Sequence, residues 1–213
     1  ANARIEIAKR PDVLRKMERA GFMVLLVGIE SAQDKKLKAM RKGFDTARAR
    51  DYFKVLSKSR MLFHGYFIVG CIGEAKRDML EILPFAKSLG VDTISVNVLR
   101  NERYSGLDEL VAVNPGYHLD EDGYIYSDDL SKSELDEIRH TINRKFYSLA
   151  RIFNVTTKLA RHRIIKLGML KYLPVFLLKA ALGSFNPADR KGDYYPEDAP
   201  AQCEGEPVTA GGD

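Results

Sequence analysis

Apolar and polar residues form two kinds of segment along the first hundred residues. Short, nearly continuous apolar runs are typical of strands buried in a parallel sheet, whereas apolar residues three or four apart are typical of amphipathic helices. The runs predict four strands, at 1–7, 22–31, 62–70 and 91–99. The intervening segments predict helices at 11–21, 32–43, 45–60 and 76–88, and Pro84 introduces a kink or a break into the last of these.

Strand and helix alternate with a spacing of about 30 residues, which predicts an α/β fold of successive βα units around a parallel sheet. Four strands are too few for a closed eight-stranded barrel. The pattern therefore leaves two alternatives open, a small open sheet or the second half of a barrel.

The pattern changes after Leu99. Residues 100–130 are rich in Gly, Pro, Asp and Tyr and predict a loop with a hairpin. A helix follows at 130–147, because Leu135, Ile138, Ile142 and Phe146 share one face and the order Ser131-Lys-Ser-Glu134 predicts a capping box. We therefore divide the chain into a βα part at 1–100, a loop and helical extension at 101–185, and a tail.

The segment at 158–182 is basic and apolar. Lys171, Pro174 and Lys179 interrupt its apolar run, so no membrane-spanning helix is expected there. A helix packed on the main domain is the favoured interpretation, and a helix that binds a membrane surface or a protein partner is the alternative. Residues 186–213 have the composition of a disordered tail.

Composition narrows the class of protein. Of the 213 residues, 45% are hydrophobic and 30% are charged, as in ordinary globular domains, and the net charge of +5 supports no nucleic-acid-binding role. Two cysteines, Cys71 and Cys203, form neither a disulfide framework nor a metal-ligand cluster, and suit the cytoplasm. No signal peptide and no initiator Met begin the sequence, so we expect a piece of a longer protein without its first part.

Candidate binding residues lie where the predicted parallel strands end, because the carboxyl ends of such strands form the ligand-binding side of βα folds. Glu30 is suited to accept hydrogen bonds from ligand hydroxyls or an amine, and Asn97 to contact a base edge or a carboxylate. Arg4, in the first predicted strand, suits a carboxylate. Glu30 has an alternative role in capping the helix that follows it. The full set at the strand ends is Arg4, Gly28, Glu30, Ser31, Gly70 to Glu74, Asn97 and Arg100.

Three motifs in order carry a resemblance to a known family. Gly28-Ile-Glu-Ser31, Leu37-Lys-Ala-Met-Arg-Lys-Gly43 and Gly65-Tyr-Phe-Ile-Val-Gly-Cys-Ile-Gly-Glu74 resemble the radical SAM superfamily, most closely its branch with a cobalamin-binding domain. The order and spacing hold over about residues 1–100. The resemblance implies the second half of a partial (β/α)6 TIM-type barrel, with S-adenosylmethionine (SAM) and a 4Fe–4S cluster as cofactors and cobalamin as a further candidate. It also implies a SAM pocket that includes Arg4, Gly28, Glu30, Ser31, Ile68, Gly70 and Asn97.

Three departures from the family pattern concern the substrate and the cluster. Ile72 stands where the family has Pro, and residues 100–106 replace a Pro-x-Pro-Gly-Thr loop, so a different substrate is expected. The Cys-x3-Cys-x2-Cys motif that holds the 4Fe–4S cluster is absent, and two remote cysteines cannot replace it. The cluster ligands are therefore expected in the missing N-terminal half of the same protein, and this chain is expected to be inactive alone.

The leading hypothesis is part of an enzyme that cleaves SAM at a 4Fe–4S cluster to generate a 5′-deoxyadenosyl radical for an unidentified small-molecule substrate. The alternative is a non-catalytic βα module that binds a protein partner or a membrane surface through the basic helix at 158–182. A phosphate-binding barrel enzyme is less favoured, because the loop from Gly70 to Glu74 carries a carboxylate where an anion would bind.

Overall fold

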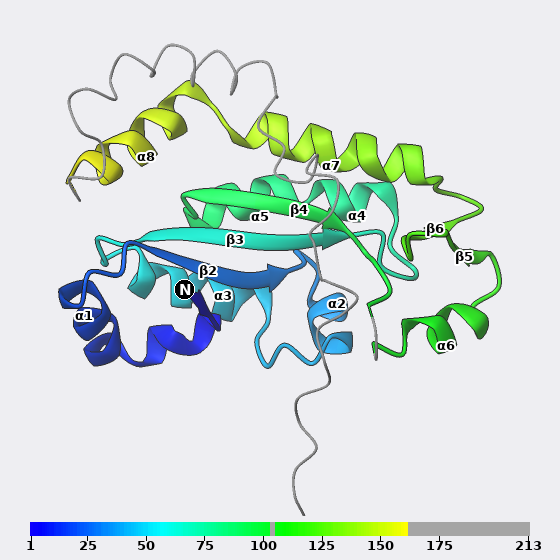
Figure 1. Cartoon of the computed structure of the whole chain (residues 1–213), viewed down its shortest axis with the longest axis horizontal. Helices are drawn as coiled ribbons and strands as arrows, with labels where there is room; N and C mark the ends of the chain where they lie inside the picture. The colour runs from blue at the N-terminus through cyan, green and yellow to red at the C-terminus, as the bar shows by residue number, and fades with distance from the viewer. Residues whose placement is uncertain (103–104, 162–213) are drawn as a thin grey trace, which may run out of the picture.

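A four-stranded parallel sheet forms the centre of the structure (Figure 1). The computed structural model describes residues 1–102 and 105–161. Each strand pairs in parallel with the next along the chain, in the order β1-β2-β3-β4. The α/β class and the parallel sheet expected from the pattern are confirmed. The strands are β1 (Asn2–Ala3), β2 (Val24–Glu30), β3 (Leu62–Val69) and β4 (Thr93–Val98).

Helices connect successive strands, as βα units require. Asp45 caps α3, since its side chain accepts a hydrogen bond of 2.7 Å from the backbone N–H of Arg48. The predicted helix at 76–88 is broken at Glu81, three residues before Pro84, which has no N–H to donate to the carbonyl of Leu80. The connecting helices are η1 (Ile5–Lys9, a 3-10 helix), α1 (Pro11–Arg19), α2 (Asp34–Ala39), α3 (Thr46–Leu56), α4 (Lys76–Leu80) and α5 (Ile82–Leu89).

A hairpin and two long helices follow the sheet. The hairpin pairs β5 (Tyr117–Leu119) with β6 (Ile125–Ser127), as expected, but the short helix α6 (Leu107–Ala112) before it was not predicted. The capping box at the start of α7 (Lys132–Phe146) is confirmed: Glu134 Oε2 accepts from the backbone N–H of Ser131 at 2.9 Å. α8 (Leu149–Arg161) is the last described helix. Within the described residues, no helix is both long and apolar enough to cross a membrane.

Two predictions for the chain ends have different outcomes. The strand expected at 1–7 is wrong in extent, because β1 ends at Ala3 and the 3-10 helix begins at Ile5. Ile5 and Ala8, three residues apart, are both buried, which suits one face of a 3-10 helix and not the alternation of a strand. Most of the segment at 158–182, and all of the tail at 186–213, lie outside the described residues.

The two faces of the sheet differ in cover. The first, which we call the covered face, packs against α3, α5 and α7, with the rings of Phe53 and Phe63 6.2 Å apart and those of Phe67 and Phe85 6.5 Å apart. In Figure 1, α3 and α5 lie behind the strands, and no described helix crosses in front of them. The covered face consists of Leu25, Val27, Ile29, Phe63, Gly65, Phe67, Val69, Ile94, Val96 and Val98.

The opposite face, which we call the open face, is half-buried or exposed along most of its length, although Leu62 at the start of β3 is buried. Strand register places its side chains in rows across the sheet: Leu26 beside His64 and Thr93, then Gly28 beside Tyr66 and Ser95. The open face consists of Leu26, Gly28, His64, Tyr66, Ile68, Thr93, Ser95 and Asn97. Most of it is polar or aromatic, unlike the second apolar layer that a buried parallel sheet normally carries.

The edge of the sheet beside β4 is blocked. The hydroxyl of Tyr147 accepts from the backbone N–H of Ile94 at 3.1 Å and donates to its carbonyl at 2.8 Å. α8 is fixed nearby, where Lys158 pairs at 2.7 Å with the buried carboxylate of Asp92, which also accepts from the N–H of Phe63. No further strand can therefore pair with β4 at Ile94.

Candidate functional site

The carboxyl end of β2 has an irregular backbone at Glu30. Glu30 has φ of +75°, in the left-handed region that residues other than glycine rarely occupy, and the register with β3 shifts between Gly28 and Glu30. A bulge of this kind re-aims the side chain that follows it. Such strain is concentrated at ligand-binding sites, where the surrounding structure maintains it.

The bulge turns the Glu30 carboxylate back along the open face, over Gly28. A Cβ atom at position 28 would lie 2.4 Å from Glu30 Oε1, so the carboxylate could keep this position only beside a glycine and would otherwise have to shift. Lys42 lies on the same side and pairs with Glu30 at 3.1 Å, both side chains being about one-fifth exposed. Glu30 and Lys42 thus place a negative and a positive charge side by side at the mouth of the sheet.

Asn97 and Ile68 lie next to each other on the open face, one strand apart. They are register partners in β3 and β4, close to the carboxyl ends of both strands. Asn97 is exposed and Ile68 is half-buried. Together with Gly28 and Glu30 they form the mouth of the open face, which is the part of the predicted site that the structure brings together.

The other predicted residues do not face this mouth. Arg4 follows β1 and does not lie within it; its guanidinium donates to Glu6 at 3.0 Å and to the carbonyl of Lys42 at 3.2 Å. Ser31 is buried, and its hydroxyl accepts from the N–H of Gln33 in the turn before α2. Both residues hold the loops that carry Glu30 and Lys42.

Gly70 packs closely against α7. Its φ is +82°, and a Cβ there would lie 3.2 Å from the side chain of Leu135 in α7. Glycine at this position therefore permits a sharp turn and close contact with α7. The following loop is anchored at both sides, because Lys36 donates to the carbonyl of Ile72 and the N–H of Gly73 donates to the hydroxyl of Tyr117 at 2.6 Å.

Cys71 and Glu74 are buried in the same loop. The N–H of Cys71 donates to Glu74 Oε2 at 3.0 Å, while Oε1 of this carboxylate has no partner among the described residues. Burial raises the pKa of Glu74, and burial together with the nearby carboxylate of Glu74 raises the pKa of the Cys71 thiol to about 12. Cys71 is therefore a neutral thiol at physiological pH and a poor nucleophile or metal ligand.

A polar group that the sequence analysis did not select lies deeper on the open face. The ring nitrogens of His64 lie 2.8 Å from the hydroxyl of Thr93 and 3.1 Å from that of Ser95. The ring of Tyr66 stands edge-on to it, with centroids 4.7 Å apart. Burial lowers the pKa of His64. Alternate polar positions in the strands at 62–70 and 91–99 were the available signal for this group.

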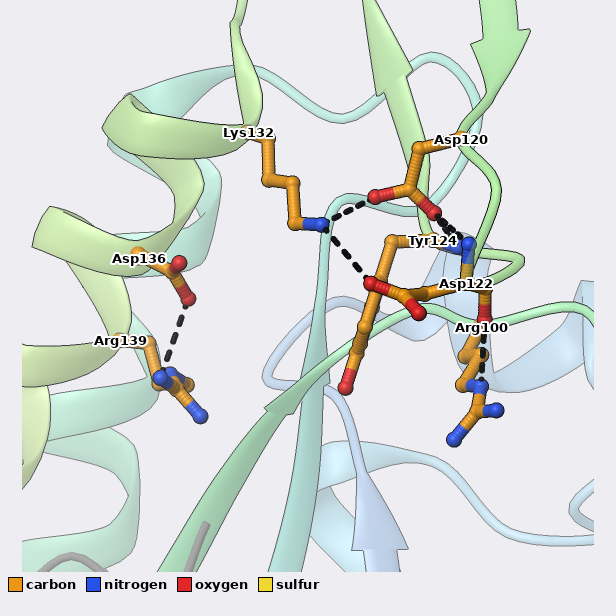
Figure 2. Close-up of polar contacts among 7 residues, drawn as sticks. All are labelled: Arg100, Asp120, Asp122, Tyr124, Lys132, Asp136 and Arg139. Atoms are coloured by element: carbon orange, nitrogen blue, oxygen red, sulfur yellow. Dashed lines mark hydrogen bonds and ion pairs between the residues drawn. The ribbon is translucent and has the colours of Figure 1, made fainter. Parts of the chain in front are cut away.

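The hairpin is tied to the end of β4 by a charged cluster. Figure 2 shows Lys132 directed at Asp120 and Asp122. The ammonium of Lys132 also lies 4.8 Å from the centre of the Tyr124 ring. Arg100 donates to the carbonyl of Asp122 at 2.8 Å. Figure 2 also shows Asp136 paired with Arg139 along α7. Since its groups are paired with one another, this cluster fixes the hairpin beside the strand ends.

The described residues do not fit an iron–sulfur cluster. Among them no group of three or more His, Cys, Asp or Glu side chains could hold a metal ion, and Cys71 is the only cysteine. Three thiolates at Cys-x3-Cys-x2-Cys spacing cannot come from a sequence with two cysteines. No protein-family model matches the chain, and no match is found among curated proteins.

Proposed function

We propose that the open face is one wall of a SAM-binding site in a radical SAM enzyme. The observation that carries the proposal is the uncovered parallel sheet. All-parallel sheets normally have both faces covered, so a polar open face within the described residues indicates a further layer or a ligand against it. In a half barrel this face is the interior, and its carboxyl end is the ligand-binding end.

The residues at the mouth of the open face are chemically suited to bind the ribose, the amino-acid group and the adenine of SAM. Glu30 can accept hydrogen bonds from the ribose hydroxyls or the ammonium group, and the amide of Asn97 can pair with polar edges of the adenine or with the carboxylate. Gly28 leaves room for the Glu30 carboxylate, and Ile68 offers an apolar surface for the adenine ring. Arg4, Ser31 and Gly70 would support this pocket indirectly, through their contacts with the carbonyl of Lys42, the N–H of Gln33 and the side chain of Leu135.

The cluster ligands would have to lie outside this chain. When bound, a 4Fe–4S cluster would supply the electron that cleaves SAM; the residues described here would bind and orient the nucleoside and exclude water. Cobalamin remains a candidate from the resemblance alone, and the substrate is an unidentified small molecule. The blocked edge at Ile94 means that additional strands would have to join beside β1.

The test is anaerobic purification of the native protein from its source, followed by iron and sulfide analysis and incubation with SAM and a reductant. We expect a 4Fe–4S cluster and formation of 5′-deoxyadenosine. Glu30→Gln should weaken SAM binding by about tenfold, the loss of one charge-assisted hydrogen bond, whereas the exposed control Glu137→Gln should not. A native protein without iron and without 5′-deoxyadenosine would refute the proposal.

A further inference from the structure

The excess positive charge of the chain is concentrated in one stretch. Residues 138–188 contain ten Lys or Arg and no Asp or Glu. The chain has 34 Lys and Arg in total, so the rest carries 24 against 29 Asp and Glu. The end of α7 and all of α8 belong to this stretch, and the sequence beyond α8 continues in the same composition, with an apolar run at 172–182. A long segment without carboxylates is unusual for a surface that only faces water.

Two large apolar side chains are exposed at the start of α8. Leu149 is 72% exposed and Phe153, one turn later, is 68% exposed. They follow the last turn of α7, where Arg144 and Lys145 are exposed as well. We call these four residues the α7–α8 corner; Figure 1 shows where α7 and α8 meet, at the top of the view.

Two basic residues of α8, Arg151 and Lys158, attach the helix to the body of the protein. Lys158 is held by the buried carboxylate of Asp92, and Arg151 donates to the carbonyl of Val91 and stacks 4.2 Å from the ring centre of Phe146. These contacts fix α8 to the body of the protein. The corner is therefore presented on a rigidly attached helix, with its two apolar side chains directed to solvent.

We infer that the α7–α8 corner binds the surface of an anionic lipid bilayer. Exposed Leu and Phe beside Lys and Arg are the combination that interfacial helices use, since the apolar groups enter the headgroup boundary while the cations approach anionic lipids. Among the described residues from 138 to 161 there is no Asp or Glu, so neither α8 nor the second half of α7 contributes a carboxylate that would repel anionic lipids. This inference is independent of the proposed SAM site.

The test is co-sedimentation of the full chain with vesicles of phosphatidylcholine alone or of an equimolar mixture with phosphatidylglycerol. We expect binding to the mixed vesicles only, weakened by added salt. Leu149→Gln with Phe153→Gln should reduce binding by about tenfold or more, because two apolar groups no longer leave water. Arg144→Glu with Lys145→Glu, a change on the other helix, should reduce it similarly.

A matched control is available on α6. Leu110 and Val113 are 45% and 72% exposed but lie beside Asp108 and Glu109, so Leu110→Gln with Val113→Gln should leave vesicle binding unchanged. Equal losses in the α6 and α8 variants would show non-specific adsorption and overturn the inference. It would also be overturned if the unmodified chain sedimented with neither kind of vesicle, or if it bound an acidic protein and no lipid.

Discussion

The two faces of one sheet are built from neighbouring residues and yet have opposite characters. Leu25 on the covered face is fully buried in the helix-packed core, whereas Leu26, the next residue, lies half-buried on the open face beside His64. All side chains of the covered face are at most 7% exposed. The difference separates two tasks within a single set of strands: the covered face holds the fold together, and the open face remains for a ligand or a further layer.

A matched pair of substitutions, one on each face, tests whether the two faces contribute differently to stability. Leu25→Ala should lower the free energy of unfolding by about 3 kcal/mol, because it leaves a cavity in a close-packed core. Leu26→Ala should lower it by about 1 kcal/mol, because its side chain is only half-buried. Urea unfolding measures both, and equal losses would contradict the distinction between the faces.

Glu74, in the loop after β3, should make the stability of the protein depend on pH. Burial raises the pKa of Glu74 above its ordinary value of 4.5, so the folded protein binds this proton more tightly than the unfolded chain. The contribution of Glu74 to stability should therefore fall as pH rises through 4.5 and then through the raised pKa. Relative to Glu74→Gln, the unmodified protein should therefore lose stability as pH rises over this window. Parallel curves for the two proteins would contradict the raised pKa.

Glu30 should show the smallest effect on stability. Glu30→Gly should remove the backbone strain of a positive φ, which stabilises the fold, and should also remove the partly exposed ion pair with Lys42, which destabilises it. Each effect is on the order of 1 kcal/mol or less. The free energy of unfolding should therefore stay within about 1 kcal/mol of the unmodified value, while SAM binding weakens. A large loss of stability would assign Glu30 to the fold and not to the ligand site.

Much of the fold could be predicted from the sequence because the determinants are local. Apolar runs and the caps at Asp45 and Ser131 identify the strands and helices. α6 was missed because it has little more than one turn and lies in a segment rich in turn residues. The extent of β1 was missed because residues 1–7 alternate small or apolar with polar residues, as a strand does, and the shared burial of Ile5 and Ala8 is seen only in the folded chain.

The site was less predictable because it depends on contacts between distant residues. The run from Val24 to Ile29 is apolar throughout, apart from Gly28, so this strand could not show which face stays open, and the signal lay in the alternate polar positions of the next two strands. The left-handed backbone at Glu30 and its pair with Lys42 also have no sequence signature. His64 was overlooked because its partners, Thr93 and Ser95, come from another strand.

The most direct test of the central claim is an NMR titration of the isotope-labelled chain with S-adenosylhomocysteine, a stable analogue of SAM. Saturable shifts should appear at the amides of Gly28, Glu30, Ile68 and Asn97, and Leu25, Phe63 and Val96 on the covered face should not move. Absence of any shift at the four mouth residues, or uniform shifts on both faces, would contradict the assignment of the open face as the wall of a SAM-binding site.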